Sequence, residues 1–476
     1  MLRASEQLIQ ALNSDTRYIT PTVKLYFNGN DKPPMILSDD DIVDLDILEE
    51  LANETDNPIG NVCSNELTLE ILNSNQIFTL TNKNSELYGK ILPGVKCEVL
   101  FNVYTDINEE KYETVKMGTY YLEDCKASST SMSAVITAYD RLYSMYELDS
   151  PDISVQHDVS VKDLFKLFFS ELGLVEYEDY LIDNTLSSII KKAWFEPTNI
   201  GSCIKSLSTS CACLVYVNRD NKIVVKDQLN LTSYDVVLSD NEQVYDIKNV
   251  PSYNEIRSSV ELEYNIPSIN TTTSELLNIT DLVIRPGSNT FEKLKFTQTP
   301  VISVSGIQVI NGRNIFIMDY EINSNSLNLI IQNNTNYEQV VNIIVHGNTI
   351  TSTTSFIRKE DAELINLIGD RPMKVNSYLL QDNNISHEYA NTLLSLVTNY
   401  GSSIEIELRG NPLIEIADVI EVNSSTYNIC EKVIPIRTTY NIKDGLTGSM
   451  LCVKADSRSH SDTVFISPGL VINSNR

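Results

Sequence analysis

The densest group of possible metal ligands is the acidic run Asp39-Asp40-Asp41 followed by Asp44 and Asp46. A calcium site requires oxygen ligands that converge at defined spacing, usually around a glycine at the turn. Here apolar residues interleave with the later acids, which is typical of a strand or loop with one face in water. We therefore expect a solvated acidic face at this position, with a calcium site as the less favoured alternative.

The cysteines and histidines show no spacing typical of zinc. Cys211 and Cys213 are the only close pair of cysteines, and they lack both the two-residue spacer and a second pair of ligands. We expect buried free thiols in a reducing compartment. The histidines form no close pair and no H-E-x-x-H pattern; they are His157, His346, His387 and His460.

Motifs for nucleophilic catalysis and phosphate binding are missing from the sequence. There is no G-x-S-x-G elbow, no G-x-G-x-x-G and no G-x-x-x-x-G-K-[ST] loop. A converging pair of carboxylates for glycoside hydrolysis stays open, because 64 acidic residues will bring some pair together. The sequence thus predicts a protein that is not an enzyme, with no catalytic, cofactor-binding or metal-binding residues.

Trp194 is the single tryptophan and lies in the segment Ala193-Trp-Phe-Glu-Pro197. An exposed indole could serve as a platform that stacks on a sugar. A buried one would anchor the two helical stretches on either side of it. We favour the anchor, because buried aromatic side chains contribute large apolar areas to cores.

The charge of the chain limits its partners. Lysine and arginine total 36 against 64 aspartate and glutamate, a net charge of −28. Such a chain should repel phosphate backbones and anionic membranes, which disfavours sequence-reading nucleic-acid binding but suits a surface past which DNA slides. No apolar run reaches the roughly 18 residues of a membrane helix. We expect no signal peptide, because the N-terminal segment lacks an apolar core with a cleavage site.

Four helices are expected from capping and periodicity. Residues 5–13 form one, capped by Ser5. Ser160-Val-Lys-Asp163 resembles a capping box and starts another, which Gly173 ends. Residues 198–210 and 386–400 form the others, and we expect Ser386 to cap the last.

Strand patterns divide the remainder into five parts. We expect a mainly β fold with α+β parts, comprising two related small β-barrel domains, a mixed α/β region and an inserted β-sandwich-like module. The predicted parts are the N-terminal helix and first barrel (1–146), the mixed region with the start of the second barrel (147–264), the inserted all-β module (265–362), the helix and return of the second barrel (363–456), and a polar, loosely held tail (457–476).

Two stretches of the chain echo one another, which suggests an internal duplication. Three copies of a chain with two similar barrels would present six similar units, as a protein that joins a threefold object to a sixfold one would need. The matched segments are Leu67–Leu72 with Ile404–Leu408, Pro93–Val99 with Ile416–Val422, Gly118–Tyr120 with Ser425–Tyr427, and Ala138–Asp140 with Ala455–Asp456.

A series of short motifs resembles the tail-hub or baseplate-hub proteins of long-tailed bacteriophages and related contractile particles. The resemblance covers roughly residues 1–260 and 365–456, and Ala417 stands where the family pattern has glycine. The motifs are Pro58-Ile-Gly-Asn61, Asn65-Glu-Leu-Thr-Leu69, Leu92-Pro-Gly-Val95, Gly118-Thr-Tyr120, Thr137-Ala-Tyr-Asp-Arg-Leu142, Ala390-Asn-Thr-Leu-Leu394, Leu408-Arg-Gly-Asn-Pro412 and Asp418-Val-Ile-Glu-Val422.

The resemblance implies a homotrimeric, ring-shaped structural hub that joins the sixfold tail tube to the tip or spike. It implies as partners the tail tube protein, the tip, spike or tape-measure protein and other baseplate proteins, with DNA passing through an acidic channel without specific binding. It places the protein in the virion tail, assembled in the host cytoplasm. The alternatives are a receptor- or carbohydrate-binding tail protein that uses residues 265–362, and a tail-associated hydrolase.

Overall fold

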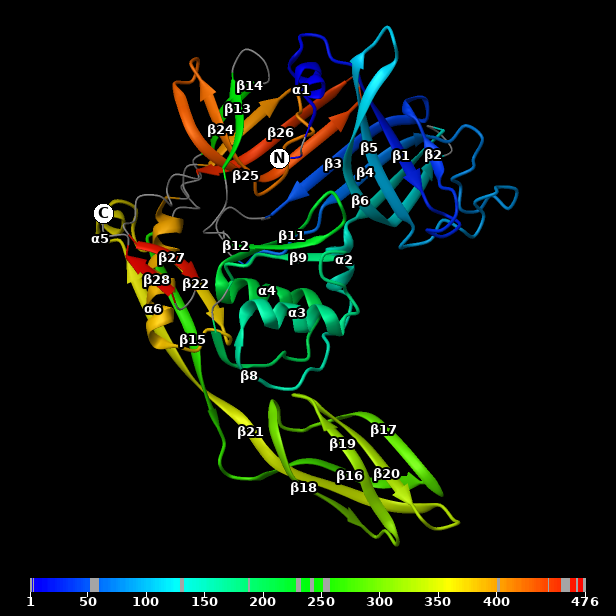
Figure 1. Cartoon of the computed structure of the whole chain (residues 1–476), viewed down its shortest axis with the longest axis vertical. Coiled ribbons are helices and arrows are strands. Elements are labelled where there is room, and N and C mark those ends of the chain that lie inside the picture. The colour runs from blue at the N-terminus through cyan, green and yellow to red at the C-terminus, as the bar shows by residue number, and fades with distance from the viewer. Residues whose placement is uncertain are drawn as a thin grey trace.

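The computed structural model shows a large sheet at the top, a mixed α/β region in the middle and a β-rich arm below (Figure 1). The predicted class, mainly β with α+β parts, is confirmed. Among the described residues, no helix is long and apolar enough to cross a membrane. The structure describes residues 2, 4–51, 60–128, 132–186, 189–227, 233–239, 244–250, 257–399, 403–443, 445–454, 463–467 and 470–473.

The large sheet has thirteen strands, and its first half follows the order β3-β4-β7-β6-β5-β1-β2. Alternate side chains of β4, β5 and β7 are buried, as their sequence alternation predicts. The predicted first helix is α1 (Glu6–Asn13), which Ser5 caps and which packs beside β5. The strands are β1 (Ile19–Leu25), β2 (Met35–Leu37), β3 (Ile42–Glu50), β4 (Glu66–Leu72), β5 (Lys96–Asp106), β6 (Lys111–Ser128) and β7 (Ser133–Tyr139), with a 3₁₀ turn, η1 (Asp39–Asp41), before β3.

The second half of the sheet comes from segments on either side of the arm in sequence. Its order is β14-β23-β26-β25-β24-β13. The strands are β13 (Ser233–Ser239), β14 (Val244–Val250), β23 (Ser403–Leu408), β24 (Val419–Ser424), β25 (Ile429–Ile442) and β26 (Leu446–Lys454).

The two halves correspond strand by strand. The order β3-β4-β7-β6-β5-β1 in the first matches β14-β23-β26-β25-β24-β13 in the second. Two bulges match as well, although the shifts within β5–β6 and within β13–β24 have no counterpart in the other half. One extra residue interrupts β3 at Val43 and β14 at Tyr245, and another interrupts β6 at Glu123 and β25 at Ile436. Because bulges are specific local features, their agreement indicates two versions of one unit. One pairing differs: β1–β5 is antiparallel, whereas β13–β24 is parallel.

The pairing registers of the strands in the two halves support most of the predicted matches between the two repeated stretches. Leu67 pairs with Ala138, and Ile404 pairs with Cys452 at the matching position. The proposed match of Gly118–Tyr120 with Ser425–Tyr427 is wrong, because the first lies within β6 and the second lies in the turn between β24 and β25. Short Tyr-containing stretches match easily by chance. Residues 455–456, used in the last match, lie outside the described residues.

The middle region packs helices on small sheets. Ser160 accepts a hydrogen bond from the Asp163 N–H and caps α3, as predicted, and Asn199 caps α4 in the same way through the Ser202 N–H. Strands β11 and β12 pair antiparallel as a hairpin. The elements are α2 (Arg141–Met145), β8 (Gln156–Ser160), α3 (Val161–Glu171), β9 (Tyr180–Ile182), β10 (Ile189–Ala193), α4 (Ile200–Cys211), β11 (Cys213–Val217) and β12 (Ile223–Asp227).

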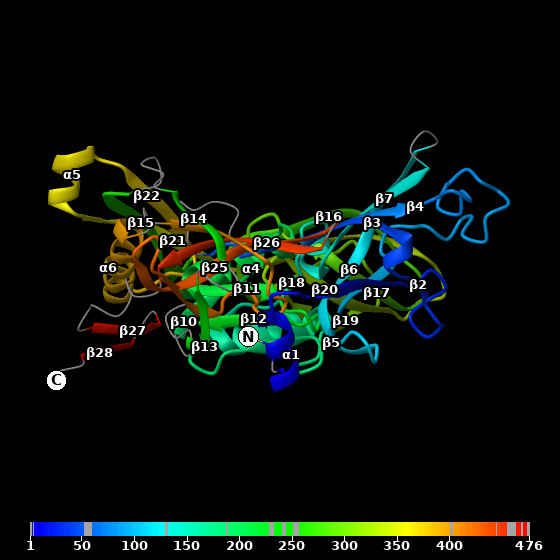
Figure 2. The ribbon, with the colours of Figure 1, turned by 90° about the horizontal axis from the view of Figure 1, so that it is seen from above.

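A long two-stranded ribbon leads to the arm, which we define as residues 270–349. In the ribbon, β15 and β21 pair from Ser259 with Glu360 to Ile269 with Ile350. Figure 2 shows α5 and β22 at one end of the molecule and the loop after β4 at the other. The elements are β15 (Ser259–Ile269), β16 (Ser274–Ile284), β17 (Gly287–Lys295), β18 (Val301–Ile310), β19 (Ile315–Ile322), β20 (Ser326–Asn333), β21 (Gln339–Glu360), α5 (Ala362–Ile368), β22 (Pro372–Ser377) and α6 (Asn383–Asn399).

One sequence expectation is wrong at an element end. Helix α6 begins at Asn383 rather than after a Ser386 cap, because Asp382 accepts a hydrogen bond from the Asn384 N–H (2.9 Å) and Ser386 is buried within the helix. The expected loose tail contains a hairpin, β27 (Thr463–Ser467) with β28 (Leu470–Asn473). Two short apolar runs rich in β-branched residues, at positions 464–466 and 470–472, favour strands in this segment.

Candidate functional site

The two halves of the large sheet meet at one strand pair, β25 with β3. They pair antiparallel, from Arg437 opposite Glu50 to Ile442 opposite Leu45. This pairing makes a continuous sheet from two units that lie far apart in sequence. We define these paired residues, with the side chains that surround them, as the junction.

Polar side chains on one face of the junction tie β25 to the acidic run. Arg437 Nε donates to Glu50 Oε1 (2.7 Å). Asn441 Nδ2 donates to Asp44 Oδ1 (2.8 Å) and to Asp46 Oδ1 (2.7 Å), and Lys443 Nζ lies 3.6 Å from Asp44 Oδ2. The run therefore lies partly in η1 and partly on the wet face of β3. Among the described residues, no group of three or more His, Cys, Asp or Glu side chains could hold a metal ion.

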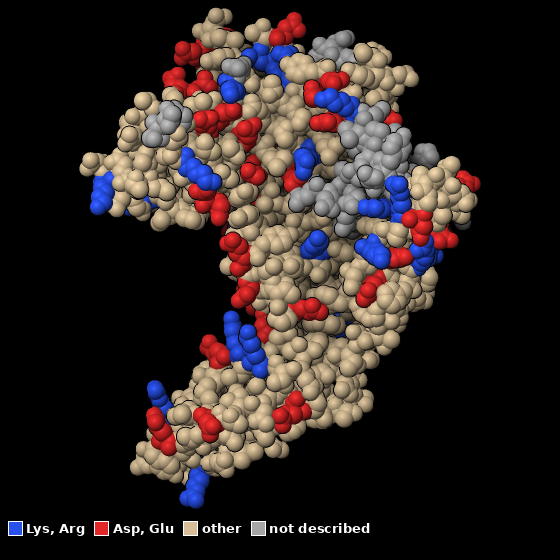
Figure 3. Space-filling model, turned by 180° about the vertical axis from the view of Figure 1, so that it is seen from behind, with Lys and Arg blue, Asp and Glu red and all other residues tan. Residues whose placement is uncertain are grey.

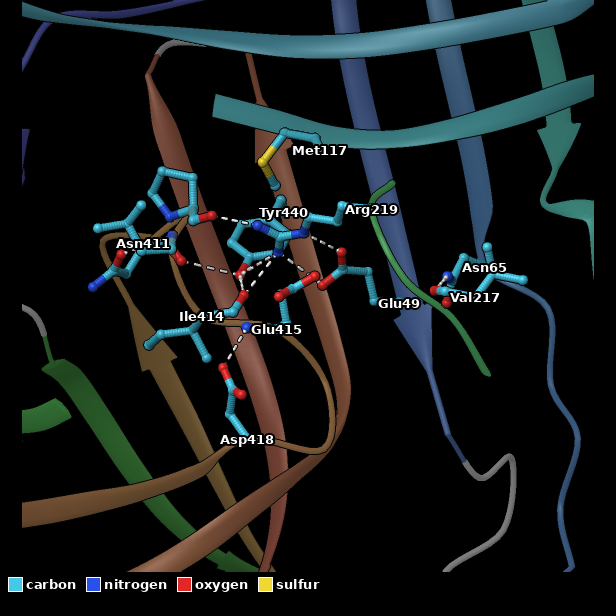
Figure 4. A network of polar contacts seen from close by, with 12 residues as sticks. Glu49, Asn65, Met117, Val217, Arg219, Asn411, Ile414, Glu415, Asp418 and Tyr440 are labelled. Atoms are coloured by element: carbon cyan, nitrogen blue, oxygen red, sulfur yellow. Dashed lines mark hydrogen bonds and ion pairs between the residues drawn. The ribbon is translucent and has the colours of Figure 1, made fainter. Parts of the chain in front are cut away.

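A buried arginine fills the centre of the junction. Arg219, from the turn between β11 and β12, reaches between the two halves and pairs with Glu49 of β3, with Nε 2.6 Å from Oε1 and Nη2 2.9 Å from Oε2 (Figure 4). Both side chains are only 4% exposed. Arg219 also donates to the carbonyls of Pro412 and Ile414, and its guanidinium lies over the Tyr440 ring.

The charges in this cluster depend on one another. Burial alone would lower the pKa of Arg219, but the negative charge of Glu49 and its hydrogen bonds outweigh burial and hold that pKa well above its usual value. Burial raises the pKa of the Glu415 carboxyl, and Arg219 opposes this effect. Arg219 is therefore a fixed positive charge that links the β11–β12 turn to β3 and to the turn that holds Pro412 and Ile414.

Residues from the hub-like motifs lie directly beside this cluster. Asn65 Oδ1 accepts the Glu50 N–H (3.0 Å), and Asn65 Nδ2 donates to the Val217 carbonyl (3.1 Å). The Asn65 N–H donates to Asp140 Oδ2 (2.8 Å), while Asp140 Oδ1 accepts the Leu142 N–H (2.9 Å) and caps α2. Two motifs that are separate in sequence thus meet at one pair, Asn65 and Asp140.

Two further motifs, Leu408–Pro412 and Asp418–Val422, flank the turn that carries the carbonyls facing Arg219. Asn411 Oδ1 accepts the Leu413 N–H (3.0 Å), and Asp418 Oδ2 accepts the Glu415 N–H (3.0 Å). Ala417 is buried with φ +64°, so it adopts the left-handed conformation that glycine would take more easily. The glycine of the family pattern is explained by this backbone conformation, which Ala417 keeps.

The solved structures that match most of this chain include two tail proteins. One is the 43 kDa tail protein of prophage MuSo2 from Shewanella oneidensis, with a TM-score of 0.51 and 12% identity over 93% of this chain and 98% of that one. The other is the tail protein from Neisseria meningitidis MC58, with a TM-score of 0.51 and 11% identity over 92% and 97%. This chain has a tail-protein fold. No family model matches the chain, and no curated protein does.

The tail-protein fold confirms the resemblance that the motifs indicated, at the level of the fold. The junction residues of this fold work as ion pairs, caps and turns. Sequence reasoning identified Asn65, Asp140 and Asp418 through the motifs but missed Arg219 and Glu49. Arg219 occupies a polar hairpin turn, and no local signal marks it as buried.

The remaining sequence candidates lie away from the junction. Trp194 is 7% exposed and packs 5.4 Å from the Tyr378 ring, so no exposed indole is available for a sugar. The eight cysteines, all among the described residues, form no disulfide; seven are buried and Cys430 is exposed. Of the four histidines, His460 lies outside the described residues.

Proposed function

We propose that the protein is the structural hub of a phage or phage-like tail, a homotrimeric ring that joins the sixfold tube to the tip or spike. The observation that carries the proposal is the match of strand order and bulges between the two halves of the large sheet. A chain with two similar units offers six similar docking positions in a trimer. The tail-protein fold supports a role in a tail.

The wet face of the sheet supports a passage for DNA. Apolar side chains of β3, β4 and β23 point into the core, so the alternate carboxylates point away from it. In the proposed ring this face lines the channel, where negative charge keeps DNA phosphates from binding. Figure 3 shows further acidic side chains along the concave edge between the upper part of the molecule and the arm. The carboxylates on the wet face are Asp44, Asp46, Glu66, Glu70, Glu405 and Glu407.

The proposed partners are further copies of the chain, the tail tube protein, the tip, spike or tape-measure protein and other baseplate proteins. The proposed place is the virion tail, and the proposed role includes no catalysis. Negative-stain electron microscopy of the purified chain tests the ring. We expect particles with a central hole and six similar lobes in a threefold outline. Particles without a hole, or with a different number of lobes, would contradict the proposal.

A second candidate function, binding of a host receptor or carbohydrate, is favoured by the arm. Phe316, Met318 and Tyr320 of β19 are all exposed, at 52%, 63% and 45%. Exposed aromatic side chains are good anchors for a partner. The arm belongs to the inserted module predicted at residues 265–362.

Removal of the arm separates the two functions. Ile269 and Ile350 pair in the ribbon, so residues 270–349 can be replaced by a two-residue Asn-Gly turn. If particles assemble but no longer adsorb to cells, the arm binds the host. If no ring forms, the arm is structural. Substitution of Phe316 and Met318 by serine in the full chain is the matched control, because it changes the exposed surface and keeps the strands.

A further inference from the structure

The large sheet has several strand edges without a pairing partner in the part of the chain that the structure describes, and two of them belong to β14 and β6. β14 is the end strand of one half and pairs only with β23. Within the first half, the pairing of β5 with β6 stops at Tyr121, so the segment from Asp124 to Ser128 pairs only with β7. Free edges readily pair with another strand, and proteins normally cover them.

The junction shows which strand each edge would pair with. Counted from the matching bulges, Arg437–Asn441 of β25 corresponds to Asp124–Ser128 of β6. By the same count, β3 corresponds to β14, so that Asp46 corresponds to Lys248. Within the chain, β25 pairs with β3 and Asn441 lies opposite Asp46. The free edges of β6 and β14 therefore correspond to the edges of β25 and β3, which already pair with each other within the chain.

We propose that β6 of one copy pairs antiparallel with β14 of the next copy, with Ser128 opposite Lys248. This inference rests on the proposed trimeric hub and gives it a specific interface. In this interface, β6 and β14 of neighbouring chains pair in the same way as β25 and β3 pair within one chain. Each chain offers one edge of each kind, so the contact is head-to-tail and closes into a ring where the rotation permits.

The exposed charges at the two edges are compatible with this pairing. Lys126 forms an ion pair with Asp124 (2.8 Å), and Lys248 forms one with Glu407. Each lysine thus already has a carboxylate on its own chain. The residue opposite Lys248 is the neutral Ser128, so no like charges face each other directly.

Paired cysteines test the register. In a Cys430→Ser background, which removes the exposed native thiol, the variant Ser128→Cys/Lys248→Cys is oxidised and run on a non-reducing gel. Opposite positions in an antiparallel pair bring Cβ atoms to about 4.5–5.5 Å, close to disulfide range. We expect efficient cross-links between chains that end at a three-chain species. The matched control, Lys126→Cys/Asp246→Cys, places the thiols four positions out of register and should cross-link at least tenfold less.

Light scattering of the reduced variant separates failure of this interface from failure of the hub. A three-chain mass with the expected cross-link supports both. A three-chain mass without it overturns the strand pairing and leaves the hub proposal standing. A one-chain mass without cross-links overturns both, and equal cross-linking in the control overturns the register.

Discussion

Arg219 shows how much of the junction rests on a single side chain. It brings a charge from the mixed α/β region into a space where Glu49 and two carbonyls are its partners. A buried ion pair contributes little net stability when compared with apolar replacements, but loss of one partner leaves an uncompensated buried charge. The cluster therefore favours one arrangement of the two halves over others.

Substitution Arg219→Ala should lower the free energy of unfolding by about 3–5 kcal/mol, because Glu49 would remain buried without its cation. Urea unfolding followed by circular dichroism measures the change. Arg285→Ala is the control: its ion pair with Glu338 is highly exposed, and its loss should cost less than about 1 kcal/mol. Equal losses in both variants would contradict the role of Arg219, whereas Arg219→Met with Glu49→Leu should restore part of the stability.

Asp140 should make stability depend on pH. Burial raises the pKa of its carboxyl to about 7, although the N–H groups of Asn65 and Leu142 oppose the shift. The ordinary pKa of aspartate is about 3.9, so between about pH 4 and pH 7 the unfolded chain releases a proton that the folded chain keeps. The contribution of Asp140 to stability therefore falls as pH rises through this range.

The variant Asp140→Asn cannot titrate, so it should show a smaller loss of stability between pH 5 and pH 7 than the unchanged protein. Urea midpoints at the two pH values measure the difference. An identical pH dependence in both proteins would show that Asp140 is not the titrating group. Glu415, whose pKa is also raised by burial, adds a contribution in the same direction.

At the scale of elements, the turn before β24 is the most constrained part of the junction. Gly410 has φ +80°, and a Cβ atom there would lie 2.7 Å from Leu446 Cγ. Gly410→Ala should therefore cost about 2–4 kcal/mol, from a left-handed backbone together with a clash. Gly89→Ala is the matched control, since Gly89 has φ +72° with nothing within 4 Å, and thermal unfolding should show a smaller loss. A larger loss at Gly89 would contradict this explanation.

The sequence predicted most elements because their signals are local. The alternation in Leu67–Leu72 and the caps at Ser5 and Ser160 depend on neighbours a few residues away. The ion pair between Glu49 and Arg219 spans 170 residues, so no local pattern reveals it. Strand order and bulges likewise follow from contacts across the sheet, which is why the predicted echo contained one false match.

At the scale of the whole molecule, a polar clasp fixes the arm to the middle region. Asn325 Nδ2 donates to Asp152 Oδ1 (3.1 Å) and to the Phe195 carbonyl (3.0 Å). Asn325→Ala should loosen this contact, and amide hydrogen exchange should rise around residues 324–326. Asn328→Ala, which removes two exposed hydrogen bonds, one to Glu321 and one from the Lys293 N–H, should leave exchange there unchanged. Unchanged exchange in both variants would show that the clasp does not hold the arm.

The central claim is that two matching halves in one chain serve a ring of three chains. Multi-angle light scattering of the purified full chain measures the mass of the particle in solution. The account predicts three chain masses over a wide range of concentrations. A single chain mass at every concentration would contradict it.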